Sequence, residues 1–379
     1  MAIFTLRFNG SAQPGFPYWD SGASGKYRFD RERFAVEIGA SYMDAFIYEW
    51  NDEPADMLNS RLAGITSGLK KNDAVLVDWP FPNQGTRWVQ ALFDNIHAFG
   101  AKIVIVIDDL YSLRMDSKLP KLGDEDGLQR YLADNLISDE VVLISQADGL
   151  IVHSTPMYQY LKQELQLVNK TITTNVAAYG PGGNKSVHFQ GRRVLSDTID
   201  YAGNLNFAQF LYDLPETFQI NVFGNRESDN KLADHTNINM HPYVDPEAIN
   251  HLLSGSFGLV WNSTTYPFAT GNIAEYTKYN TEAKLSMYLA ADEPVIVWSQ
   301  ASFAKFVADN QVGIVIDDLS QLPDKLAQIT AADYDALIDN VQRISPQIRS
   351  GFFFKKAVFD VLGKIYDFSD STAVSTHDE

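Results

Sequence analysis

The sequence predicts an α/β protein with two domains, each built on a doubly wound parallel sheet. The first observation is the length of 379 residues, which exceeds the size at which a single hydrophobic core usually stops growing. The second is the alternation of short apolar runs with helix-compatible segments, which is typical of parallel sheets crossed by helices. The third is a glycine-rich stretch in mid-chain, NVAAYGPGGNKS at 175–186, which we expect to be the hinge between the domains. An ordinary surface loop is the alternative for this stretch.

Composition excludes several classes of protein. The formal net charge is −18, so the chain is a poor candidate for nucleic-acid binding. It contains no cysteine, which excludes disulfides and cysteine zinc sites, and its seven histidines show no HxH or HExxH spacing, so no metal site is predicted. The run of about 18 apolar residues that a membrane span requires is absent. The N-terminus also lacks a signal-like segment, so we expect a cytoplasmic protein.

Five apolar runs are the expected strands of the first sheet, at residues 3–8, 45–48, 74–77, 102–107 and 150–152. Ligands of such sheets bind outside the carboxyl ends of the strands, so the residues at those ends are candidates for the site. These residues are Asn9, Gly10 and Ser11 after the first run, Trp79, Pro80 and Asn83 after the third, Asp108 and Asp109 after the fourth, and His153 and Ser154 after the fifth.

The two aspartates that close the most apolar run, KIVIVIDD, are the candidate catalytic residues. Adjacent residues at a strand end point in different directions, so we expect only one of Asp108 and Asp109 to face a ligand. That carboxylate would act as a general base toward an acceptor hydroxyl. The alternative is a structural role, as a helix N-cap or in a salt bridge with Arg114. His153 is a second candidate, but a histidine that ends a buried strand is more often a hydrogen-bonded structural residue.

The second half of the chain repeats the pattern, with expected strands at 198–201, 219–223, 238–240, 259–261, 295–298 and 312–316. Gly203 and Asn204 form a turn after the first of these strands, and Phe207, Phe210 and Leu211 follow at helical spacing. We expect Gly203 to let backbone N–H groups approach a ligand at the start of that helix.

Tyr243 lies in a loop after the third of these strands. Asp245 is a suitable N-cap for a helix that would follow the loop, with Pro246 at its first position. Tyr243 either stacks on or hydrogen-bonds a nucleobase, or simply packs the loop.

A helix that begins near Thr281 is the most informative element of the second half. Asn280 or Thr281 would be its N-cap, and Leu285, Tyr288 and Leu289 would form its buried face. Lys284 lies in the first turn, where a cation opposes the helix dipole and a capping box would place glutamate. A diphosphate between the helix N-terminus and the ammonium would explain this arrangement, and it suggests a nucleotide-sugar site. The alternative is a solvated surface lysine.

The end of the chain predicts a helix that crosses back to cover the first domain. Its apolar stripe consists of Phe354, Val358, Val361, Leu362 and Ile365. We assign residues 351–369 to this crossover helix. The polar tail at 370–379 is expected to be disordered.

Two nucleotide-binding-type halves, a glycine-rich hinge and an apolar last helix are together typical of the GT-B architecture of glycosyltransferases, in which two domains face a central cleft. Four segments carry a closer resemblance: FGLVW at 257–261, YAGNL at 201–205, KLSMYLAADEPVIVW at 284–298 and GFFFKK at 351–356. They resemble the bacterial glucosyltransferase-3-like family. That family is related to galactofuranosyltransferases and includes members that extend the first GlcNAc on serine-rich repeat adhesins. The resemblance covers nearly the whole chain.

The resemblance implies a glycosyltransferase that uses a UDP-sugar and needs neither a metal nor another cofactor. Residues 1–178 would be the acceptor-binding domain and residues 179–350 the donor-binding domain. The transferred sugar would be a hexose or N-acetylhexosamine, with glucose or GlcNAc favoured. The acceptor would be a sugar, most simply GlcNAc on a serine-rich repeat glycoprotein, and the chain would form a homotetramer or dimer.

The resemblance also assigns roles to single residues. Lys284 matches the lysine expected at the UDP phosphates, Tyr243 matches a tyrosine near the nucleotide, and Gly203 and Asn204 match the Gly-Asn turn. Asn206, Asn280, Thr281 and Ser286 complete the candidate donor site. On the acceptor side, Asn9, Gly10 and Ser11 match a loop that lines the cleft opposite the donor, and Trp79 and Asn83 are added to it.

Three departures from the family pattern stand out. Asp108 replaces the histidine of an HD pair, and Asn206 stands where the family tends to have a basic residue. Asp292 and Glu293 replace a glycine-containing turn, a change that we expect to be structural. Asp109 is the expected base if the reaction inverts the anomeric centre, whereas a retaining reaction needs no protein base for the acceptor. A noncatalytic GT-B-like subunit that binds a glycoprotein or a partner transferase, and a UDP-sugar epimerase, are the alternatives.

Overall fold

The computed structural model describes residues 1–9, 23–46, 50, 52–81, 85–114, 140, 142–168, 176–178, 180, 182–185, 191–224, 232 and 235–367. The candidate residues Gly10, Ser11 and Asn83 lie outside these ranges, as does the tail at 370–379.

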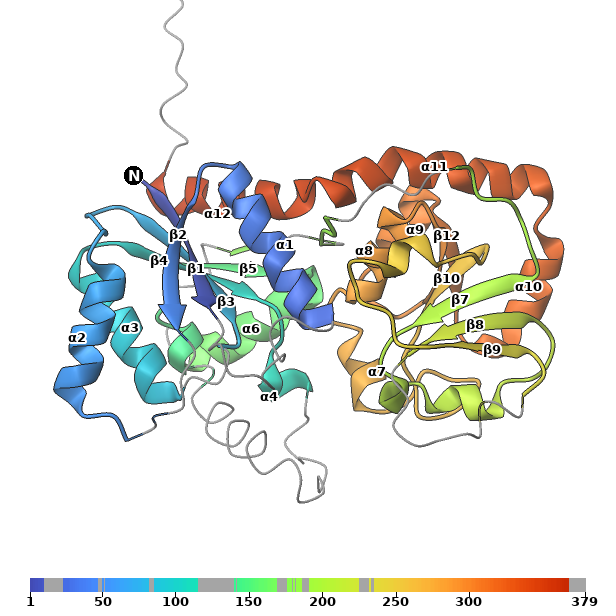
Figure 1. The fold of residues 1–379 in the computed structure, drawn as a ribbon, viewed down its shortest axis with the longest axis horizontal. Coiled ribbons are helices and arrows are strands. Elements are labelled where there is room, and N and C mark those ends of the chain that lie inside the picture. Colours follow the sequence, from blue (N-terminus) through green and yellow to red (C-terminus); the bar gives the residue numbers. More distant parts are fainter. Residues whose placement is uncertain are drawn as a thin grey trace, which may run out of the picture.

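The first domain is built on a sheet of six parallel strands in the order β2-β1-β3-β4-β5-β6 (Figure 1). The strands are β1 (Ile3–Asn9), β2 (Ser41–Phe46), β3 (Ala74–Trp79), β4 (Lys102–Ile107), β5 (Gly149–Val152) and β6 (Val176–Ala178). The helices are α1 (Ala23–Glu37), α2 (Ala55–Thr66), α3 (Thr86–Ala98), α4 (Tyr111–Arg114) and α6 (Thr155–Val168).

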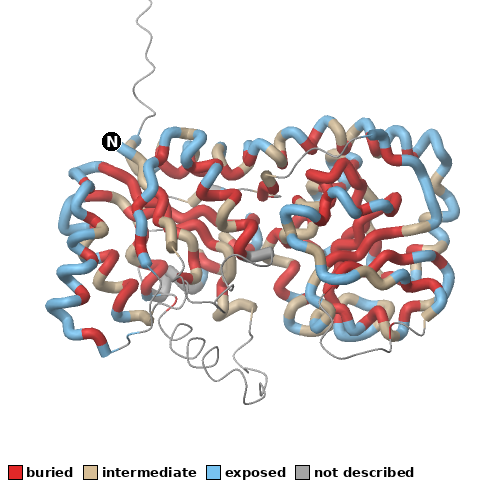
Figure 2. Tube along the Cα trace, in the orientation of Figure 1, coloured by how far each residue is buried: buried red, intermediate tan, exposed pale blue. Residues whose placement is uncertain are grey.

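Helices cover both faces of this sheet, which explains why β4 is apolar along its whole length. Side chains alternate between the two faces of a strand. Ile103 and Ile105 accordingly join a core with residues of α2, α3 and α6, while Val104 and Val106 join a second core with residues of α1 and the C-terminal helix. Buried residues are concentrated along the strands of both domains (Figure 2).

The second domain is built on another sheet of six parallel strands, in the order β12-β11-β10-β7-β8-β9. The strands are β7 (Thr198–Ala202), β8 (Gln219–Phe223), β9 (Ile238–His241), β10 (Phe257–Val260), β11 (Val295–Trp298) and β12 (Gly313–Ile316). The α-helices are α7 (Asn272–Tyr276), α8 (Ala283–Ala290), α9 (Ala304–Asn310), α10 (Leu322–Gln328) and α11 (Ala331–Arg349), and the 3₁₀ helices are η3 (Leu205–Phe207), η4 (Gln209–Asp213), η6 (Ile249–His251) and η7 (Leu319–Gln321).

The chain returns to the first domain through α12 (Phe352–Tyr366), so that α11 and α12 run along one side of both domains (Figure 1). Phe354, Val358, Val361 and Leu362 are buried, and α12 contacts β5, β6 and α1. The stripe read from the sequence therefore covers the first sheet as predicted. Two parallel-sheet domains with this crossover form the GT-B fold, and the predicted fold class is confirmed.

The glycine-rich stretch at 175–186 contributes to the first domain. Its start forms β6, which pairs with β5 as the last strand of the first sheet. Gly182 and Gly183 are buried, and a β-carbon on Gly182 would lie 1.8 Å from the Tyr27 hydroxyl oxygen. The backbone N–H of Lys185 donates to Asp30 at 2.9 Å. These glycines serve close packing against α1.

None of the helices in the described part of the chain combines the length and the apolar character that a membrane crossing requires.

Candidate active site

The second sheet has a topological switch point between β7 and β10, because the strand order runs outward in opposite directions from these two strands. Ligands of open α/β sheets bind outside the carboxyl ends of the strands at such a point. The residues just beyond those ends are Gly203 after β7, and Trp261 and Asn262 after β10.

Lys284, in the first turn of α8, reaches this switch point. Its Nζ atom donates to Asn262 Oδ1 at 2.7 Å and to Glu282 Oε2 at 3.2 Å. Its side chain is only 14% exposed, so it is not the solvated surface lysine that was the alternative interpretation. Burial alone would lower the pKa of Lys284, but the neighbouring Tyr201 and Glu282 outweigh burial and raise it, so the ammonium stays charged.

Gly203 is required for the position of Lys284. A β-carbon at residue 203 would lie 2.6 Å from Lys284 Cε and 3.2 Å from Nζ. The N–H of Gly203 donates to the Phe223 carbonyl at 3.0 Å within the sheet. The N–H of Gly203 itself is therefore engaged within the sheet, and the missing side chain makes room for the lysine.

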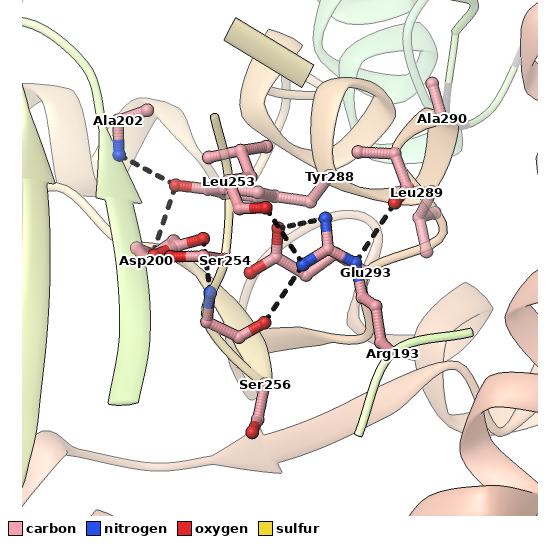
Figure 3. Close-up of polar contacts among 12 residues, drawn as sticks. Arg193, Asp200, Ala202, Leu253, Ser254, Ser256, Tyr288, Leu289, Ala290 and Glu293 are labelled. Atoms are coloured by element: carbon pink, nitrogen blue, oxygen red, sulfur yellow. Dashed lines mark hydrogen bonds and ion pairs between the residues drawn. The ribbon is translucent and has the colours of Figure 1, made fainter. Parts of the chain in front are cut away.

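Tyr288 holds α8 against the sheet. Its ring lies over Gly258 of β10, where a β-carbon would come within 2.2 Å of the ring. Its hydroxyl accepts from the Ala202 N–H at 2.7 Å and donates to the Asp200 carbonyl at 3.2 Å (Figure 3). Because Ala202 ends β7, these bonds join the helix that carries Lys284 directly to the strand that precedes Gly203.

A buried charged network lies beneath this helix (Figure 3). Arg193 donates to the carbonyl oxygens of Ala291, Leu253 and Gly255 and lies 3.5 Å from Glu293. Burial raises the pKa of Glu293 well above its ordinary value, although Arg193 opposes the shift. The side chain of Glu293 thus belongs to the interior.

The neighbouring Asp292 adopts a left-handed conformation with φ of 57°, and Arg349 donates to its carboxylate at 3.2 Å. Glycine adopts a left-handed conformation at little cost, which agrees with the glycine-containing turn that the resemblance implies at this position. The expectation that the Asp292-Glu293 pair is structural is confirmed.

The start of α8 differs from the prediction. The helix begins at Ala283 with Glu282 as N-cap residue, so neither Asn280 nor Thr281 caps it. Thr281 is buried, and the Asn280 Oδ1 atom is buried without a hydrogen-bond partner among the described residues. Ser286 is fully buried and donates to the Ala283 carbonyl at 3.0 Å, so its side chain supports the helix.

The Gly-Asn turn continues into short 3₁₀ helices instead of the expected α-helix. Asn204 caps η3, because its Oδ1 atom accepts from the Asn206 N–H at 2.9 Å, and both side chains are exposed. Tyr243 is 51% exposed in the loop after β9. Asp245 accepts from the Glu247 N–H at 2.8 Å but caps only a turn that leads into η6, not an α-helix.

The two aspartates after β4 are both held by arginines. Arg31 of α1 donates to Asp78 at 2.8 Å and to Asp108 at 3.1 Å. Burial alone would raise the pKa of Asp108, but the ion pair with Arg31 outweighs burial and lowers it. Asp109 forms an ion pair with Arg114, and burial raises its pKa to about 6 despite this partner. The salt bridge with Arg114, the alternative to a catalytic role, is present.

Tyr276 of α7 brings the second domain to these aspartates. Its side chain is 3% exposed and packs in the core of the first domain. Its hydroxyl accepts from the Leu110 N–H at 3.0 Å and donates to Asp109. Three residues after Tyr276, the carbonyl of Tyr279 accepts a hydrogen bond from Ser154, which lies just after β5. Asp109 is thus part of an interdomain contact that sequence reasoning missed, because no local pattern marks a tyrosine that packs in the other domain.

Two further candidates of the first domain are structural. His153 is buried, and its Nε2 atom donates to the Asp108 carbonyl at 2.7 Å. Burial lowers its pKa to about 4, so it is neutral at pH 7 and has the structural role expected of such a histidine. Trp79 is completely buried and donates to Glu140 at 2.8 Å. The prediction that Trp79 contacts an acceptor is wrong, whereas Asn9, which donates to Asp44 at 3.1 Å, lies at the carboxyl end of β1.

Known proteins resemble this chain along most of its length. Two family models match it, described as glucosyltransferase 3-like, N-terminal domain, at residues 18–176, and glucosyltransferase 3-like, C-terminal domain, at residues 199–361. Glucosyltransferase 3 of Streptococcus gordonii is 24% identical over 337 residues, which cover 89% of this chain and 93% of the relative. Beta-1,6-galactofuranosyltransferase WbbI of Escherichia coli (strain K12) is 24% identical over 356 residues, covering 89% and 94%.

A solved structure shares the fold. The glycosyltransferase from Rickettsia africae ESF-5 aligns with a TM-score of 0.56 at 10% identity, covering 97% of this chain and 99% of that chain.

Proposed function

The chain belongs to the glucosyltransferase 3-like family of glycosyltransferases, and from this premise we propose that it transfers a hexose or N-acetylhexosamine, with glucose or GlcNAc favoured, from a UDP-sugar to a sugar acceptor. The names of the relatives support glycosyl transfer, since they are two streptococcal glucosyltransferases and a galactofuranosyltransferase. The acceptor that we propose is GlcNAc on a serine-rich repeat glycoprotein.

The observation that carries this proposal is the position of Lys284. A buried ammonium, the N-terminus of α8 and the switch point of the second sheet coincide there. In the proposed reaction the UDP leaving group develops negative charge as the bond to the anomeric carbon breaks. Lys284 and the helix dipole stabilise that charge, the task that a divalent cation performs in other transferases, so the reaction needs no metal.

The Glu282 carboxylate lies 3.2 Å from the Lys284 ammonium. Donor binding would bring a diphosphate to this ammonium, and the diphosphate carries more negative charge than the single Glu282 carboxylate. The acceptor binds to the first domain, and the contact of Tyr276 with Leu110 and Asp109 sets the position of that domain relative to α8. We further propose that the protein is cytoplasmic and assembles as a homotetramer or dimer.

The test is UDP release from a panel of UDP-sugars, with and without a GlcNAc-bearing peptide, for the native chain and for Lys284→Ala. We expect acceptor-dependent release with one donor and its loss in Lys284→Ala. Lys305→Ala is the matched control, because Lys305 is an exposed helical lysine that pairs with Asp309. Interconversion of the nucleotide sugar without any acceptor would indicate an epimerase instead.

A noncatalytic subunit is the second candidate, and the Glu282–Lys284 ion pair favours it, because this pair neutralises the cation proposed to hold the diphosphate. Asn206, where the family tends to have a basic residue, adds no positive charge. Native protein that binds a GlcNAc-bearing peptide but releases no UDP from any donor would establish this second function.

A further inference from the structure

The first sheet has its own switch point, and a buried carboxyl group lies beside it. In the order β2-β1-β3-β4-β5-β6 the strands run outward in opposite directions from β1 and β3. Asn9 ends β1 and Trp79 ends β3, with Pro80 next in the chain. Helix α1 crosses this edge, since Arg28 donates to the Pro80 carbonyl at 3.1 Å.

Glu32 lies one turn further along α1 and is only 4% exposed. Its carboxyl group makes no hydrogen bond in the described part of the chain, although its oxygens are not sealed from solvent as those of Glu293 are. Buried carboxyl groups normally have hydrogen-bond partners, so one at a ligand edge that has none among the described residues needs an explanation.

The charges around Glu32 come from three elements: Arg7 of β1, Asp78 of β3, and Arg28 and Arg31 of α1. Two of these have carboxylate partners of their own. Arg7 lies 2.6 Å from Asp44, and Arg31 binds both Asp78 and Asp108. Burial raises the pKa of Glu32 to about 8, with Asp78 adding to the shift and the arginines opposing it. A base works best when its pKa is near the working pH.

Helix α1 also contacts α8, the helix that carries Lys284. Ala283, the first residue of α8, packs against the first-domain core that contains Tyr27 and Phe34 of α1. The helix that crosses the first switch point thus touches the helix that starts at the second. Asp108 and Asp109, by contrast, are held by Arg31, Arg114 and Tyr276.

We propose that Glu32 is the general base that deprotonates the acceptor hydroxyl, an inference that rests on the proposed function. The O–H bond of the acceptor breaks and its proton passes to the Glu32 carboxylate. The acceptor oxygen forms a bond to the anomeric carbon of the donor from the face opposite the diphosphate. The bond between that carbon and the diphosphate oxygen breaks, and UDP leaves with the electron pair.

The test compares native protein with Glu32→Gln, which keeps the shape of the side chain but cannot accept the proton. We expect kcat to fall by about 100- to 10,000-fold, the usual contribution of a general base, while the Kd for UDP changes less than twofold. In the native protein kcat/KM should rise with pH up to about pH 8, and this dependence should disappear in Glu32→Gln. Glu37→Gln is the control, because Glu37 is an exposed residue of α1 paired with Lys355.

Azide separates a catalytic role from a structural one. As an anionic nucleophile it needs no base, so Glu32→Gln should form the glycosyl azide from the active UDP-sugar at a rate near that of native protein. A Glu32→Gln variant with native kcat, a variant that azide does not rescue, or a product that retains the donor's anomeric configuration would each overturn the proposal. Native protein that turns over no donor would instead refute the proposed function itself.

Discussion

Gly203→Ala tests directly whether the position of Lys284 determines donor binding. The added β-carbon would lie 2.6 Å from Lys284 Cε, about 0.8 Å short of the 3.4 Å at which ordinary contact begins. The atom that must yield is near the end of a flexible side chain, and the backbone of Gly203 is not in the left-handed region. We therefore expect the domain to fold while the ammonium moves away from Asn262 and Glu282.

The magnitude follows from the proposed contact between the Lys284 ammonium and the UDP diphosphate, which this displacement would remove. A hydrogen bond to a charged group contributes about 1.5–3 kcal/mol, so displacement of the ammonium should raise the Kd for UDP by about 10- to 150-fold. Titration calorimetry measures this change, and thermal unfolding shows whether the variant is folded. Gly64→Ala is the matched control, because a β-carbon at that position meets no atom within 4 Å.

A double variant identifies the cause. If Gly203→Ala acts through the lysine, adding it to Lys284→Met should change the Kd for UDP by less than twofold. UDP affinity of Gly203→Ala within twofold of the native value would refute the reasoning. A further loss in the double variant would show that residue 203 acts on the ligand by another route.

The remaining predictions concern stability and metal dependence. Tyr276→Phe removes the hydroxyl at the interdomain contact and should lower the free energy of unfolding by about 1–3 kcal/mol in urea titrations; an unchanged midpoint would contradict this. Arg193→Met leaves a buried carboxyl group and three carbonyls without their partner and should cost about 3–5 kcal/mol, measured in the same way. Since the pKa of His153 is about 4 when folded and about 6.5 when unfolded, the unfolded chain binds a proton first and stability falls as the pH drops through this window. The native protein should lose about 3 kcal/mol more over this window than His153→Gln, and equal losses would count against the effect of burial. Transfer activity should persist in EDTA; loss of activity that Mg²⁺ restores would show that Lys284 does not replace a metal.

Local patterns were sufficient to predict most strands of the two sheets and the last helix. A strand that is buried on both faces is apolar along its length, so the apolar run that forms β4 could be recognised from its own residues. The apolar stripe of α12 could also be recognised from the sequence, because its helical spacing places the buried side chains on one face. The sequence predicted the start of α8 near Thr281, but the helix begins two residues later, at Ala283. Its N-cap residue is Glu282, whose side chain makes no capping hydrogen bond.

The anomaly of Lys284 was also local, because a cation in the first turn of a helix is unfavourable wherever the helix lies. Its partners were not predictable. Asn262 and Gly203 come from the ends of two other strands, and only the strand order of the second sheet brings them beside the lysine. A glycine that makes room for a distant side chain has the same sequence signature as a glycine in a turn.

By itself the sequence therefore determined the two α/β domains, the crossover helix and the lysine of the candidate site, since each depends on spacing within one element. The tertiary structure decided which carboxyl groups are engaged. Asp109 and Tyr276 are 167 positions apart, and their contact turns a candidate base into part of an interdomain contact. Glu32 has no local signature, because its burial and the charges around it depend on everything that folds around the residue.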